Sequence, residues 1–184
     1  MKILLFSGSL RKDSLNKKLL SVIDQLIKKF PDCETRIADL KSLSIPVYDG
    51  DIEAEGIPQG VLELGKMIKE ADAIITCSPE YNGSIAGSLK NTIDWVSRIR
   101  PVPLEKKPIL LTGASPGAFG SIRALGQTRA PFEALGSYVY PQSFALPKAH
   151  EAFSTEGTLV DQGTEKKLEG LLLGYLEFAK RLKA

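Results

Sequence analysis

Residues 3–16 read ILLFSGSLRKDSLN, an apolar run followed by a loop rich in hydroxyl groups and then by helical spacing. The run Ile3-Leu4-Leu5-Phe6 is short and uniformly apolar, which is typical of a strand buried on both faces of a parallel sheet. Apolar residues then recur at steps of three and four from Leu15 to Phe30, so we expect a helix that Pro31 ends. The stretch therefore predicts a strand, a turn and a helix, the first half of a βαβ unit.

The same alternation continues along the chain. Further strands are predicted at 35–40, 73–77, 108–112 and 138–140, and further helices at about 61–71, 85–96, 119–135 and 168–182. Five strands that alternate with five helices indicate an α/β protein with right-handed crossovers and a parallel sheet covered on both faces. We expect loops at 42–59 and 141–162, and one domain over residues 1–184.

Composition limits the function only broadly. Lys and Arg number 24 against 22 Asp and Glu, and this net charge of +2 is far from the basic patch that binding to nucleic acid or a membrane surface requires. Cys33, Cys77 and the single histidine, His150, lack metal-ligand spacing, so we expect no metal site, no disulfide and a buried Cys77 thiol. Neither a signal peptide nor an apolar run of ~18 residues is recognisable, so a cytoplasmic location is expected.

Ligands of an open parallel sheet bind beyond the carboxyl ends of its strands, so the loops after the first, third and fourth strands form the candidate site. In the first loop, Ser9, Arg11, Ser14 and Asn16 precede a helix whose free N–H groups and dipole favour an anion such as phosphate. Simple helix capping by Asp13 or Ser14 is the alternative interpretation. The GxxxxGK[ST] motif is missing, which excludes an NTPase P-loop.

The second loop carries Pro79-Glu80-Tyr81-Asn82-Gly83. Pro79 and Gly83 bracket a stiff turn whose backbone amides can face a planar heterocycle, while Tyr81 offers an aromatic face and Asn82 can donate and accept hydrogen bonds. An ordinary solvent-exposed turn is the alternative. The third loop, residues 112–121, reads TGASPGAFGS and is equally unusual.

The segments GSLRKDSLN (8–16) and PEYNGSIAGSLKNTIDW (79–95) resemble the two signature segments of the NADPH-dependent FMN reductase family, which includes bacterial chromate, quinone and azo-dye reductases. The third loop resembles the family's SPG-x-x-GG-x-R element, which Arg123 completes. The resemblance covers nearly the whole chain. It implies a flavodoxin-like three-layer sandwich with a five-stranded parallel sheet in the order 2-1-3-4-5.

The resemblance also implies FMN as the cofactor and NADPH or NADH as co-substrate. Two positions depart from the family pattern: Ala86 replaces a common Pro, and Ser121 replaces the second Gly of the GG pair, which costs backbone freedom if φ is positive there. The residues that match the family's FMN contacts are, around the phosphate and ribityl chain, Ser9, Arg11, Ser14, Leu15 and Asn16, along the isoalloxazine ring, Pro79, Glu80, Tyr81, Asn82 and Gly83, and on the other side of the ring, Ser115 and Gly117.

The activity implied is a ping-pong cycle in which NAD(P)H reduces FMN and leaves, and a quinone, flavin, azo compound or chromate takes its place. Because the flavin carries the redox chemistry, we assign no catalytic base or nucleophile and expect His150 to be a loop residue. Arg98 and Arg100 either favour anions or form a solvated pair at a helix end. Trp95 lies off the apolar stripe of its helix, which predicts a subunit contact, and the resemblance implies a homodimer or homotetramer.

Two other functions compete with this hypothesis. A flavodoxin-type electron carrier without enzymatic activity is typically strongly acidic and lacks an arginine in its phosphate loop, so Arg11 and the net charge of +2 argue against it. A regulatory or structural module that kept the fold and lost the flavin would be colourless, so the colour of the purified protein distinguishes it.

Overall fold

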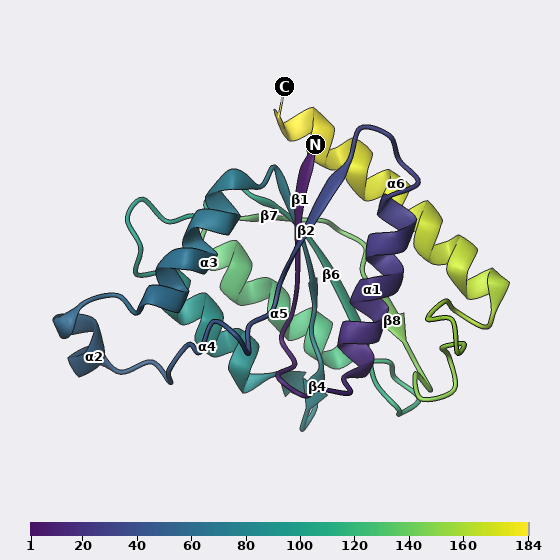
Figure 1. Ribbon diagram of the computed structural model, residues 1–184, viewed down its shortest axis with the longest axis horizontal. Helices are drawn as coiled ribbons and strands as arrows, with labels where there is room; N and C mark the ends of the chain where they lie inside the picture. Colours follow the sequence, from purple (N-terminus) through teal and green to yellow (C-terminus); the bar gives the residue numbers. More distant parts are fainter. Residues whose placement is uncertain (184) are drawn as a thin grey trace.

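The computed structural model describes residues 1–183, in which a parallel sheet lies between two layers of helices (Figure 1). Six strands within that range pair in the order β2-β1-β3-β6-β7, with β8 also paired to β6, and each pairing is parallel. The predicted α/β class and strand order are confirmed, whereas Ala184, the last residue of the predicted domain, lies outside the described residues. The strands are β1 (Lys2–Ser7), β2 (Glu34–Ala38), β3 (Ala73–Cys77), β6 (Pro108–Ala114), β7 (Tyr138–Val139) and β8 (Phe144–Leu146).

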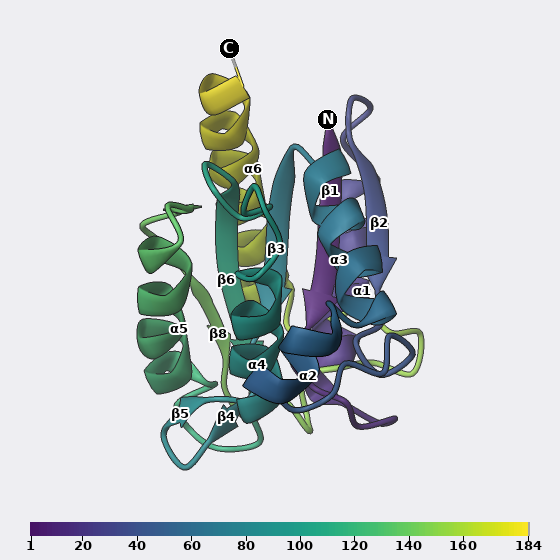
Figure 2. The ribbon, with the colours of Figure 1, turned by 90° about the vertical axis from the view of Figure 1, so that its left-hand side faces the viewer.

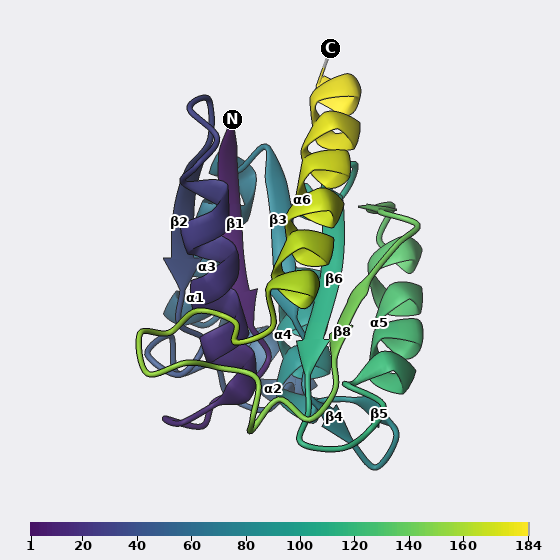
Figure 3. The same ribbon diagram turned by 90° about the vertical axis from the view of Figure 1, so that its right-hand side faces the viewer.

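Helices cover both faces of the sheet (Figures 2 and 3). One face carries α1 (Leu15–Ile27) and α6 (Gln162–Lys183), and the other carries α3 (Gln59–Glu70), α4 (Gly87–Val96) and α5 (Ile122–Ala134). Along β1, Ile3 and Leu5 pack on the α1 side while Leu4 and Phe6 pack on the α3 side, because successive side chains of a strand point to opposite faces. This two-sided burial explains why the strand is uniformly apolar.

The outermost strand differs from the prediction. Residues 138–140 were expected to form one strand and 141–162 a loop, but β7 pairs with the start of β6 and β8 pairs with its end. Pro141 follows between them, and a proline has no N–H to donate to a ladder, so the strand is interrupted there. The expected loop therefore contains a strand that continues the edge of the sheet.

The end of the first helix and the content of the loop 42–59 also differ from the prediction. The first helix ends at Ile27 rather than at Pro31, because Lys28 caps it and the next residues form turns in which Phe30 donates to the carbonyl of Ile27. The expected loop 42–59 contains a short helix, α2 (Gly50–Glu55). Asp49 is its N-cap, because the Asp49 side chain accepts a hydrogen bond from the N–H of Asp51.

The carboxyl ends of the central strands lie side by side. Ser7 of β1 is in register with Cys77 of β3, which is in register with Thr112 of β6. The next two strands of the sheet, β2 and β3, pair with opposite edges of β1. The order of the strands therefore reverses between β1 and β3. The loops after these strands meet at the lower end of the molecule in Figure 1.

Candidate functional site

A cleft at this end of the sheet brings the three predicted loops together. Its empty space is about 380 Å³, including the part that is open to solvent. Of the predicted residues, Asn82, Gly83 and Gly117 do not line it. The lining residues are Ser9, Arg11, Ser14, Leu15, Asn16, Pro79, Glu80, Tyr81, Ala114, Ser115 and Pro116.

The start of α1 forms one side of the cleft. Ser14 caps the helix, because its hydroxyl oxygen accepts hydrogen bonds from the N–H groups of Asn16 (3.2 Å) and Lys17 (3.3 Å). The capping interpretation is thus confirmed, and it leaves the Ser14 hydroxyl hydrogen able to donate to a ligand. Arg11 is exposed and has no ion pair within the described range 1–183, and the first turn of α1 contains no acidic residue. This side of the cleft is therefore positive.

Asn16 joins the first loop to the third. Its Nδ2 donates to the carbonyl of Ala114 and its Oδ1 accepts from the N–H of Ala114, both at 2.9 Å. The residue is buried, and these two bonds fix the orientation of its amide. Asn16 therefore positions the end of β6 against α1, a role that no local sequence pattern predicts.

The second loop is a β-hairpin made of β4 (Glu80–Tyr81) and β5 (Ser84–Ile85), with Asn82 and Gly83 as its two-residue turn. Both turn residues have positive φ, 53° and 75°, which is the requirement of a type I′ turn and the reason that Asn-Gly suits it. The predicted stiff turn is thus the turn of a hairpin, and its Asn-Gly pair is the sequence signal for that hairpin. Pro79 is buried at its base, and Tyr81 is half-exposed at the cleft.

The Glu80 side chain connects the hairpin to α5. Its Oε1 accepts from Nε of Arg123 (2.8 Å) and from a second guanidinium nitrogen, and its Oε2 accepts from the N–H of Ala124 (3.3 Å). Burial opposes ionisation, but the bonds from Arg123 and Ala124 prevail and hold the pKa of Glu80 below the usual carboxyl range. Glu80 lies at the cleft as predicted, but both oxygens of its carboxylate are hydrogen-bonded to residues of α5.

The third loop contains the predicted departure at Ser121. Its φ is +76°, so this position does need the left-handed conformation that glycine adopts freely. The Ser121 side chain is buried and its hydroxyl has no hydrogen-bond partner in the part of the chain described. Ser115 and Gly117 are held by β8 and the residues after it, since Ser115 donates to the carbonyl of Leu146 and Gly117 accepts from Lys148. The other departure, Ala86, is buried directly before α4 at φ −63°, which any residue adopts.

The prediction for Trp95 is wrong. Its side chain is fully buried, its Nε1 donates to the carbonyl of Pro46 (2.9 Å), and its ring meets that of Tyr48 edge-on at 5.0 Å. The segment before α2 therefore covers the face of α4 that we expected to contact another subunit. Arg98 lies over the Tyr48 ring, and Arg100 donates to main-chain carbonyls at the end of α4. Both guanidinium groups therefore have partners within this chain at the end of the helix.

The remaining titratable candidates lie outside the cleft. His150 is an exposed loop residue beside Glu151, as predicted. Cys77 is fully buried and its sulfur lies 2.9 Å from Oγ1 of Thr112. Burial raises the pKa of this thiol to about 12. Among residues 1–183, no group of three His, Cys, Asp or Glu side chains could hold a metal ion, and no helix is long and apolar enough to cross a membrane.

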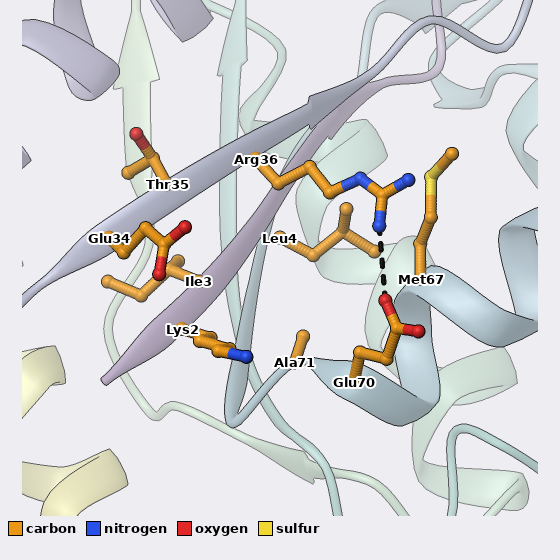
Figure 4. A pocket seen from close by; sticks show the side chains of 9 residues that line it. All are labelled: Lys2, Ile3, Leu4, Glu34, Thr35, Arg36, Met67, Glu70 and Ala71. Carbon is orange, nitrogen blue, oxygen red and sulfur yellow. Dashed lines mark hydrogen bonds and ion pairs between the residues drawn. The ribbon is translucent and has the colours of Figure 1, made fainter.

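A second depression lies at the opposite, amino-terminal ends of β1 and β2, beside the end of α3 (Figure 4). Its most prominent contact is an ion pair of 3.1 Å between Arg36 and Glu70, two largely exposed side chains. None of the three loops reaches it. We therefore assign the candidate site to the cleft at the carboxyl ends of the strands.

Comparison with known proteins agrees with this geometry. Residues 1–151 match the family described as NADPH-dependent FMN reductase. The chain is 33% identical to the quinone reductase of Escherichia coli K12 over 100% of this chain and 97% of that protein. It is 35% identical to an NAD(P)H-dependent FMN reductase of Pseudomonas aeruginosa, with the same coverage of 100% and 97%.

Among solved structures, the flavoenzyme NAD(P)H:(acceptor) oxidoreductase FerB of Paracoccus denitrificans superposes with a TM-score of 0.86 at 31% identity, over 98% of this chain and 97% of that one. The predicted flavodoxin-like class is confirmed by this agreement. Because the sequence match spans most of the chain and the structural match nearly all of it, the chain belongs to the NADPH-dependent FMN reductase family.

Proposed function

We propose that this chain is an FMN-dependent NAD(P)H oxidoreductase that delivers a hydride from NAD(P)H to quinones and other flat acceptors. The observation that supports this most is the convergence of three strand-end loops on one cleft, with a positive, hydroxyl-rich side next to a hairpin. Relatives named quinone reductase and NAD(P)H-dependent FMN reductase support the same activity.

The residues at the start of α1 fit a phosphate group. Arg11 makes no ion pair with a carboxylate of residues 1–183, and the first turn of α1 has no acidic residue to oppose the helix dipole. Hydrogen bonds from a guanidinium to phosphate are charge-assisted and strong. We therefore assign the FMN phosphate to Arg11, to the hydroxyls of Ser9 and Ser14 and to the N–H groups around Leu15.

The hairpin and the third loop fit the ring. FMN, when bound, supplies the hydride-transfer chemistry, so the protein has to hold and orient it. We assign the ring to the space between Pro79–Gly83 and Ser115–Gly117, with backbone amides of the hairpin as hydrogen-bond donors. Asn16 holds the third loop in place through Ala114. The buried Cys77 thiol is protonated at neutral pH, so we assign it no nucleophilic role.

A flavodoxin-type electron carrier is the alternative function, and the names of the relatives favour a reductase over it. The decisive experiment is to identify the chromophore released from the purified protein and to follow NADPH and NADH oxidation with and without a quinone. We expect a yellow protein that absorbs at about 450 nm, contains FMN and, with oxygen excluded, turns over only when the quinone is present. A carrier would bind FMN and turn over negligibly, and a protein that stays colourless in excess FMN would contradict both functions.

Three finer points remain predictions: chromate and azo compounds as further acceptors, a cytoplasmic location, and a homodimer or homotetramer. Four large apolar side chains on the first loop, the hairpin, the third loop and the start of α5 are exposed, which supports assembly over this end of the molecule: Leu10, Tyr81, Phe119 and Ile122. Sedimentation analysis of the FMN-loaded protein would measure the oligomeric state.

A further inference from the structure

The β4–β5 hairpin is attached to α5 by polar contacts at both of its ends. At its base, Glu80 accepts from Arg123 and from the N–H of Ala124. At its turn, Gln127 donates to the carbonyl of Gly83 (3.2 Å) and accepts from the hydroxyl of Ser84 (2.5 Å). Figure 2 shows the hairpin below the amino-terminal end of α5. Since these side chains are polar, charge and hydrogen-bond geometry contribute to the position of the hairpin, alongside the packing of Ile85 against the core.

Glu80 caps the first turn of α5, which has no side-chain cap from the residue before the helix. Ser121, the residue before α5, makes no side-chain hydrogen bond to the first turn of the helix. The carboxylate of Glu80 reaches this turn from the hairpin and accepts from Ala124, where the helix dipole favours a negative charge. Only 8% of the Glu80 side chain is exposed, so its carboxylate is held in place at the start of the helix.

Arg123 extends the connection to the third loop. Its guanidinium lies 5.0 Å from the centre of the Phe119 ring, a cation–π contact, while it also pairs with Glu80. Phe119 belongs to the loop that follows β6 and Glu80 to the hairpin that follows β3. The two loops assigned to opposite sides of the flavin ring are thus joined through one arginine.

We propose that Glu80 is a positioning residue for the flavin ring: through Arg123 and the start of α5, its carboxylate fixes the hairpin whose backbone contacts the ring. This inference rests on the proposed function. It predicts that Glu80 affects the ring and leaves the phosphate end unaffected, because the contacts of Glu80 are to α5 and those of the phosphate are assigned to α1. A purely structural Glu80 would change global stability alone.

The test compares Glu80→Gln and Arg123→Lys with Glu133→Gln, a control that removes an exposed carboxylate of α5 paired with Arg129. Apoprotein is titrated with FMN and with riboflavin, which lacks the phosphate, and amide hydrogen exchange of residues 80–85 is followed without ligand. We expect Glu80→Gln to weaken both ligands by the same factor, roughly 5- to 20-fold, and to speed exchange in the hairpin. The ligand affinities and the hairpin exchange rate of Arg123→Lys should lie between those of Glu80→Gln and those of the control.

Equal riboflavin affinity and equal hairpin exchange in Glu80→Gln and the control would overturn the inference. If Glu80→Gln does not fold, Arg123→Lys, which keeps the charge and loses the two-nitrogen contact with Glu80, is compared with the control, and unchanged values there would also overturn the inference. A wild-type protein that binds neither ligand would refute the proposed function. The hairpin exchange measured in apoprotein would then show separately whether Glu80 fixes the hairpin.

Discussion

The amide of Asn16 bridges α1 and β6 by bonding to both the N–H and the carbonyl of Ala114, each at 2.9 Å. Replacing Asn16 with Ala would leave both main-chain groups of Ala114 without these partners in a buried place. We expect Asn16→Ala to lower the free energy of unfolding by about 1–3 kcal/mol and to weaken FMN binding as well. Urea denaturation measures the first effect. Gln25→Ala, an exposed change on the same helix, is the control and should leave both quantities unchanged.

Arg11 should matter for FMN and little for riboflavin. Its guanidinium is exposed and makes no ion pair in the described chain, so Arg11→Ala removes the proposed phosphate contact without disturbing the fold. The expected loss is about 1.5–3 kcal/mol of FMN binding free energy, as for a hydrogen bond to a charged group. Lys12→Ala removes the same charge from the neighbouring residue and serves as the control. Equal FMN affinity in wild type and Arg11→Ala would show that the phosphate binds elsewhere.

Ser121→Gly should stabilise the protein. The substitution relieves a non-glycine residue at φ +76° and removes a buried hydroxyl that has no partner, although glycine gains entropy in the unfolded chain. The net change expected is about 1 kcal/mol in favour of the folded state. Ser121→Ala removes the hydroxyl and keeps the backbone cost, so urea denaturation of the two variants separates the contributions. Destabilisation by Ser121→Gly would indicate that the hydroxyl has a partner after all.

Glu80 should contribute to stability in a pH-dependent way. Its pKa is lower in the folded protein than in the unfolded chain, so its contribution is complete above the unfolded value of about 4.3 and is lost as pH falls through the lower folded value. The difference in unfolding free energy between wild type and Glu80→Gln should therefore be constant near neutral pH and shrink in acid. Denaturation curves at a series of pH values measure it. A difference that does not change with pH would mean that ionisation of Glu80 contributes nothing.

The two cysteines should differ in reactivity. Cys77 is fully buried and burial raises its pKa to about 12, so the reactive thiolate is scarce and inaccessible, whereas Cys33 is partly exposed. An aromatic disulfide reagent should modify one thiol in the native protein and two in denaturant. Native Cys33→Ala should then show no rapid reaction. Rapid modification of that variant would mean that the end of β3 opens readily.

The sequence was sufficient for the central sheet and the site loops because their signals are local. Ile3-Leu4-Leu5-Phe6 is apolar because both faces of β1 are covered, and Ser9, Arg11 and Ser14 follow where such a strand must end. The positive φ suspected at Ser121 is likewise a property of one position in a short motif.

What the sequence could not provide depends on contacts between distant segments. Trp95 is covered by Pro46 and Tyr48, and helical periodicity carries no information about a loop that folds back over a helix. The link between Asn16 and Ala114 spans 98 positions and that between Glu80 and Arg123 spans 43. Such pairs follow from the assembled sheet, which alone decides which loops become neighbours.

The division of the outermost strand at Pro141 has a consequence for solubility during folding. A long, regular edge strand exposes a row of unpaired N–H and carbonyl groups on which another chain can add, leading to aggregation. Here β7 and β8 are two and three residues long. At the opposite edge, β2 carries the charges of Glu34 and Arg36. Neither margin of the sheet therefore offers an uninterrupted, uncharged template, and we expect the protein to resist intermolecular strand addition at both.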